Sequence, residues 1–218
     1  MSNIVAFAKA GLPAVQDLAT TLRKMENTVE VGTAILKMDK TGHWVFGADQ
    51  TEVEEAATWA VNPFSFTHGF IAWGSEKTPA AGTVLGEVMV SVAEPLPDPG
   101  RAPEHAHKGW ETQVGMSLKC MSGEDTGMDV RFPATSVGGK RAVQTLAVAI
   151  ATQVDKDASK PVPVVKLNKE HYQHKSYGRI YTPVFDIVDW ISMDGEASAP
   201  AQAEPPPEAP TSGRRRRG

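Results

Sequence analysis

Cations and flat rings are interleaved in one short stretch of this sequence, KLNKEHYQHKSYGRIYTP at residues 166–183. The stretch contains all three tyrosines of the chain and two of its six histidines. Proteins that bind single-stranded nucleic acid use cations to follow the backbone and flat rings on which bases stack. The residues that supply these two kinds of contact are Lys166, Lys169, Lys175, Arg179, His171, Tyr172, His174, Tyr177 and Tyr181.

The spacing within this stretch predicts a shared face. Side chains alternate along an extended strand, so Lys175, Tyr177, Arg179 and Tyr181 would all point to one side of a hairpin arm. This geometry favours a strip that binds single-stranded DNA. The alternative is a solvated hairpin whose tyrosines pack at its base.

Two further pairs of residues suit contacts with a nucleic acid. Lys140 and Arg141 lie in ATSVGGKRA at residues 134–142, which lacks the first glycine and the hydroxyl residue of a phosphate-binding loop. The segment is therefore read as a glycine turn into a helix, whose start can still seat a backbone phosphate. Phe64 and Phe66, in the turn NPFSF, are candidate exposed stacking platforms.

Other chemistry finds little support in the sequence. His105 with His107, and His171 with His174, are spaced to share a metal but have no cysteine near them and no HExxH pattern. Cys120 falls on the apolar side of an alternating strand, which is typical of a small core residue. We therefore expect no enzyme, no metal and no cofactor.

The elements that must position these residues follow from hydrophobic periodicity. Strands are expected at 33–38, 43–46, 83–93, 110–120, 128–132, 164–167 and 181–191, with Pro183 marking an edge or a bulge. The apolar segments 59–61 and 70–73 flank the turn-rich link NPFSFTHG. On strand 110–120, we expect Val114, Met116, Leu118 and Cys120 to be buried and Gln113, Gly115, Ser117 and Lys119 to face water. A helix is expected over 136–154, capped by Ser136.

The order of these elements predicts the fold class. Several strands occur without helices between them, which argues against a βαβ series. We expect a mainly β (α+β) domain of about seven or eight strands, an antiparallel OB-like barrel with one central helix. The barrel would span residues 29–193, after an arm with a helix at 1–28 and before a disordered tail at 194–218 that ends in Arg214–Arg217.

Composition and net charge limit the cellular location and the partners that we expect for this protein. The chain has 218 residues, a net charge of −4 and a single cysteine, and its longest apolar runs are too short to cross a membrane. These features predict a cytoplasmic protein with no membrane partner. Net negative charge argues against coating of duplex DNA by bulk charge, while leaving local phosphate contacts open.

Several segments together resemble a family of uncharacterised phage and prophage proteins. They are WAVNPFSFTHGFIAW, GEVMV, SVGGKRA, PVPVVKL and HYQHKSYGRIYTPVFDIVDW. The resemblance covers residues 31–193 and implies a phage single-stranded DNA-binding protein in replication or recombination. Such proteins usually end in an acidic tail with an apolar tip, and this chain departs from that with its arginine run.

Two classes of function follow. The first is binding of single-stranded DNA without sequence preference, with replication or recombination proteins and further copies of the chain as partners. The alternative is a phage structural or host-factor interaction protein that does not bind nucleic acid.

Overall fold

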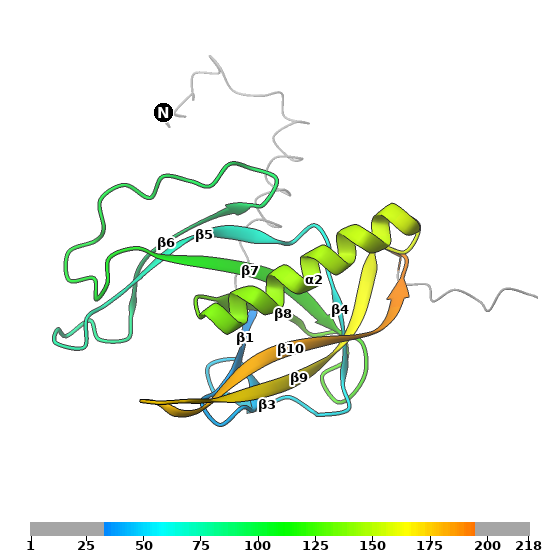
Figure 1. Ribbon diagram of the computed structural model, residues 1–218, viewed down its shortest axis with the longest axis horizontal. Helices are drawn as coiled ribbons and strands as arrows, with labels where there is room; N and C mark the ends of the chain where they lie inside the picture. Colours follow the sequence, from blue (N-terminus) through cyan, green and yellow to red (C-terminus); the bar gives the residue numbers. More distant parts are fainter. Residues whose placement is uncertain (1–32, 195–218) are drawn as a thin grey trace, which may run out of the picture.

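Residues 33–194 are described by the structure, a computed structural model (Figure 1). The expected N-terminal helix lies outside these residues, as does the expected tail except for Asp194. The described part has ten strands and one helix, which confirms a mainly β fold. The elements are β1 Ala34–Met38, β2 Trp44–Phe46, β3 Thr51–Glu52, β4 Thr58–Val61, β5 Thr67–Trp73, β6 Val84–Ser91, β7 Glu111–Cys120, β8 Asp129–Ala134, α2 Val137–Lys156, β9 Val162–His174 and β10 Gly178–Ile191.

One sheet contains all ten strands, and eight of them follow the order β10-β9-β4-β7-β8-β1-β2-β3. Strand β7 is at its centre, because β8 pairs with one of its edges and β5 and β4 pair in succession with the other. Strand β6 extends the sheet beyond β5. The expected strand count was low, partly because β3 has only two residues and no pattern of its own.

The sheet curls without closing by backbone hydrogen bonds within residues 33–194. Trp44 on β2 donates its indole N–H to the carbonyl of Asn168 on β9 at 3.0 Å, although the two strands are far apart in the strand order. The expectation of a purely antiparallel sheet is wrong at one place, since β1 pairs with β8 in parallel. The curl brings β1 back beside β8, and no short hairpin has to join them.

Three aromatic rings fill the space inside the curl. Trp44, Phe132 and Phe185 come from β2, β8 and β10, and their ring centroids lie 5.2–5.6 Å apart. Tilted and edge-on rings at this distance attract beyond simple burial. The three rings therefore tie together strands that share no hydrogen-bond ladder.

Strand β7 follows its predicted pattern except at Gln113 and Gly115, which are both buried. Met116, Leu118 and Cys120 are buried as expected, and Val114 packs against the same core. Gln113, expected to face water, is only 3% exposed. Its amide donates to the carboxylate of Glu87 on β6, and this bond satisfies the polar group in its buried place.

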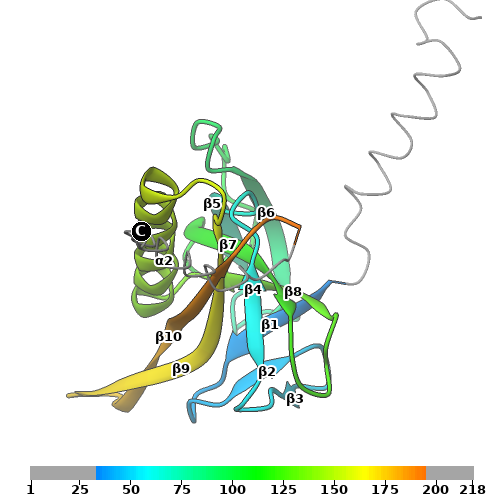
Figure 2. The same cartoon turned by 90° about the vertical axis from the view of Figure 1, so that its right-hand side faces the viewer.

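Helix α2 begins where the sequence places it. The hydroxyl of Ser136 accepts the N–H of Gly139 at 3.1 Å, which is an N-cap, and Val143, Leu146 and Ile150 are buried against the sheet. Figures 1 and 2 show the helix beside β10, and the two elements pack together. The edge position of β10 agrees with the prediction from Pro183, whereas the bulge of this strand lies elsewhere, between Ile187 and Asp189.

The ring cluster predicts a large stability difference between two identical substitutions. Phe132 is 4% exposed and Phe64 is 77% exposed. Phe132→Ala should lower the free energy of unfolding by about 3–5 kcal/mol because it leaves a cavity among the rings. Phe64→Ala should change it by no more than about 0.5 kcal/mol. Urea denaturation of both variants measures the difference, and equal effects would contradict the role of the cluster.

Candidate nucleic-acid interface

The β9–β10 hairpin carries most of the candidate residues and extends beyond the body of the protein. Strand β4 pairs with β9 only at Val164–Lys166, whereas β10 pairs with β9 as far as His174. The outer part of β9 therefore has β10 as its only ladder partner among the described strands. Both views show the hairpin projecting from the sheet (Figures 1 and 2).

One face of the hairpin groups two cations with two rings. Residues opposite each other in an antiparallel pair share a face, and Tyr181 lies opposite His171, with ring centroids 5.8 Å apart. Lys169 places its ammonium 5.6 Å from the centre of the Tyr181 ring. Arg179 lies two residues before Tyr181 in β10, and side chains two residues apart on a strand point to the same side. We call Lys169, His171, Arg179 and Tyr181 the hairpin face.

The expected alternation fails at the tip. Strand β9 ends at His174 and β10 begins at Gly178, so Lys175 and Tyr177 lie in the turn. The alternation of a strand does not reach a turn, and these two residues are not aligned with Arg179 and Tyr181 as predicted. Tyr177 instead stacks on His174, with centroids 4.8 Å apart, and is 78% exposed.

Tyr172 belongs to the opposite side of the hairpin, because it lies opposite Ile180 rather than a member of the hairpin face. There it lines a groove of about 490 Å³ together with Arg141 of α2. Two residues selected separately from the sequence, one from the hairpin and one from the helix, are thus brought together.

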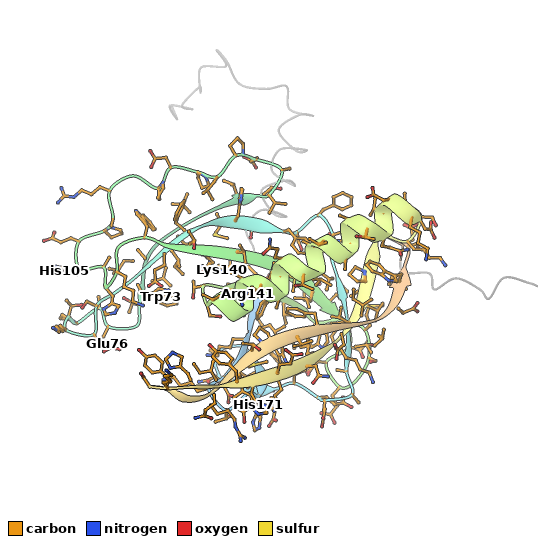
Figure 3. The ribbon with its side chains drawn as sticks, in the orientation of Figure 1. Trp73, Glu76, His105, Lys140, Arg141 and His171 are labelled. Atoms are coloured by element: carbon orange, nitrogen blue, oxygen red, sulfur yellow. The ribbon has the colours of Figure 1, made fainter. Side chains whose placement is uncertain are left out.

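Lys140 and Arg141 are adjacent in sequence but have different surroundings. The ammonium of Lys140 donates to the hydroxyl of Thr112 on β7 at 2.8 Å. Arg141 lies beside β10, in the groove that Tyr172 lines. Figure 3 shows both near the start of α2.

The two phenylalanines of the NPFSF turn have opposite environments. Phe66 is buried in the main core, so the prediction of an exposed ring is wrong there. Phe64 is exposed as predicted. Strand β4 runs antiparallel to β9, with Ala60 opposite Val164, so the turn after β4 lies at the end away from the hairpin tip. The structure therefore does not bring Phe64 near the hairpin face.

Lys166 lies at a second groove, of about 550 Å³, between β9 and the segment around β3. Its walls carry Lys166 and Lys169 on one side and Glu52, Glu54 and Glu55 on the other. Acidic groups repel phosphates, so this groove does not suit a nucleic-acid backbone. Lys169 lines this groove too, but it also approaches the Tyr181 ring of the hairpin face, whereas Lys166 does not belong to that face.

The hairpin cations are free of ion pairs among the described residues. Residues 33–194 contain the ion pairs Lys119–Asp129 and Arg131–Glu87 and a contact of His43 with Glu52 that is an ion pair only when the imidazole is protonated. None of the three includes a cation of the hairpin. A cation without an acidic partner can bind a phosphate without first breaking an ion pair, and such charge-assisted hydrogen bonds are strong.

Gly42 is a positioning residue that the sequence did not single out. It has φ +85°, and a Cβ atom there would lie 2.6 Å from the Tyr181 ring. The turn that holds it is built by Asp39, whose carboxylate accepts the N–H groups of Thr41 and His43. Hydrogen bonds from the Thr41 hydroxyl and the His43 backbone lower the pKa of Asp39. Gly42 and Tyr181 are far apart in the sequence, so no local pattern reveals their contact.

The thiol of Cys120 and the candidate metal ligands are the other groups of the sequence that could be reactive. Cys120 is buried as predicted, and its thiol donates to the carbonyl of Ser122 at 3.1 Å. Burial raises the pKa of this thiol and so disfavours the reactive thiolate. Within residues 33–194, no group of three or more His, Cys, Asp or Glu side chains is arranged to hold a metal ion. No helix in this range has the length and apolarity needed to cross a membrane.

Comparison with known proteins identifies no relative: no protein-family model, no curated protein and no solved structure matches the chain.

The hairpin tip depends on His174, which yields a testable prediction. Its Nδ1 accepts the N–H groups of Ser176 and Tyr177, at 3.1 and 3.3 Å. His174→Ala removes this acceptor and the ring under Tyr177, so the ¹⁵N order parameters of Ser176 and Tyr177 should fall below about 0.6. His174→Asn retains a side-chain acceptor and should keep them higher. Equal order parameters in both variants would contradict the turn-capping role.

Proposed function

We propose that this protein binds single-stranded DNA without sequence preference, through the β9–β10 hairpin. The supporting observation is the hairpin face. It places Lys169 and Arg179 beside the rings of His171 and Tyr181, on an element that projects from the body. Cations of this kind contact phosphates of any sequence, and every base has a flat surface that can stack on a ring.

The proposal includes a partly open, OB-like barrel as the finer description of the fold. A curled sheet, with its helix between β8 and β9, supports this description. Barrels of that type bind single strands on their sheet surface and loops. The resemblance to phage proteins suggests a role in phage replication or recombination, with proteins of those processes as partners.

A paired set of variants tests the role of the hairpin face. Arg179→Ala with Tyr181→Ala removes one phosphate contact and one stacking ring, so affinity for labelled oligo(dT) should fall tenfold or more. The slope of log affinity against log salt should also become shallower by about 0.7, because one phosphate contact is lost. Fluorescence anisotropy at several salt concentrations measures both quantities.

The matched control changes the same positions but keeps their chemistry. Arg179→Lys with Tyr181→Phe retains one charge and one ring, and should bind within about threefold of the unchanged chain, since both kinds of contact remain. Circular dichroism establishes that both variants are folded. An alanine pair that binds as tightly as the control would exclude the hairpin face. A chain that does not bind oligo(dT) at moderate salt would favour the alternative interaction role.

A further inference from the structure

The groove between α2 and β10 has features that the hairpin face does not use. Its helix wall includes Gly138, Ala142, Thr145 and Ala149, which recur about once per turn and carry small side chains, and Val137 lies beside the first of them. The opposite wall includes Thr182, Pro183 and Val184 of β10. Helix and strand approach closely at one end, where a Cβ on Gly138 would lie 2.6 Å from Thr182. Beyond that contact, the small side chains leave about 490 Å³ open.

The lining of this groove is apolar inside and polar at two sides. Leu146, Phe185 and Ile187 contribute apolar surface. Tyr172 is 50% exposed, and Arg141 is exposed with no ion pair among the described residues. One acid, Glu170, also lines the groove. An apolar slot beside a ring and a free cation suits a flat heterocycle attached to a phosphate.

We propose that this groove receives one unstacked base of the bound strand, with Tyr172 against the base and Arg141 at an adjacent phosphate. This inference rests on the proposed function and adds a second contact on the other side of the same hairpin. A strand that follows the hairpin face past the tip would reach Tyr172, because Tyr172 and Tyr181 lie on opposite sides of one two-stranded ribbon. Arg141 provides the charge complementarity to the phosphate.

An added peptide strand fits this groove less well, although β10 is an edge strand. Pro183, at the middle of the β10 wall, has no N–H to donate to a new ladder. The bulge between Ile187 and Asp189 interrupts the edge a second time. Prolines and bulges are the features by which edge strands avoid pairing with other chains. A base needs no such ladder, so the observations favour a nucleotide over a peptide.

A groove-filling variant tests the inference in the full chain. Thr145 is exposed on the helix and lines the groove, whereas the neighbouring Gln144 is exposed and does not. Thr145→Trp should therefore occupy the slot, and Gln144→Trp is the matched control. Affinities are measured for a 15-nucleotide oligo(dT) and for an abasic oligonucleotide of the same length. Thr145→Trp should weaken binding of oligo(dT) about tenfold, equivalent to about one lost base stack, and leave abasic binding within twofold.

The outcomes separate the inference from the proposed function. Equal oligo(dT) affinities for Thr145→Trp and Gln144→Trp would overturn the groove assignment and leave a protein segment as its occupant, while the hairpin-face variants could still bind weakly as proposed. Equal losses on the oligo(dT) and abasic strands would overturn base insertion. An unchanged chain that binds neither strand would overturn both proposals. Tyr172→Ala should reproduce the loss, and Tyr172→Phe should restore binding because it keeps the ring.

Discussion

The packing of Trp44, Phe132 and Phe185 is the interaction on which the rest of this structure depends. No backbone ladder joins the ends of the curled sheet within the described residues, so side chains must hold them together. The three rings do this from β2, β8 and β10, and the indole of Trp44 adds a hydrogen bond to Asn168 on β9. A buried aromatic cluster tolerates little displacement, because interiors are close-packed. The base of the β9–β10 hairpin is therefore anchored in the core.

Anchoring at the base determines what the hairpin presents. Leu167 and Phe185 pair across the two strands at the core, and the same side continues outward as Lys169, Tyr181 and their neighbours. The tip lies beyond the reach of β4, so polar side chains replace apolar ones there. Gly42 sets the position of Tyr181 from the other end of the curl, because only a residue without a side chain leaves room for the ring. The β9–β10 hairpin thus packs in the core at its base and carries the candidate site farther out.

The local elements were predictable because short-range patterns specify them. The cap at Ser136, the apolar stripe of α2 and the alternation of β7 each depend on residues within a few positions. The predictions of burial that were wrong concern residues whose surroundings come from parts of the chain distant in sequence. Phe66 is buried by strands remote in the sequence, and Gln113 is accommodated by Glu87 across the sheet. Lys175 and Tyr177 were misplaced because alternation does not indicate where a turn begins.

The sequence by itself determined that the part of the chain that the structure describes, residues 33–194, is mainly β with a central helix and carries a stretch rich in cations and rings, since composition and period are local properties. Only the tertiary structure decided on which side of the hairpin each of those residues lies and which other elements it meets. Register separates Tyr181 from Tyr172 onto opposite sides of the hairpin, and helix packing joins Tyr172 to Arg141 across a groove. These relations depend on strand pairing and on contacts such as Trp44 with Asn168, 124 residues apart. No local pattern encodes contacts over that separation.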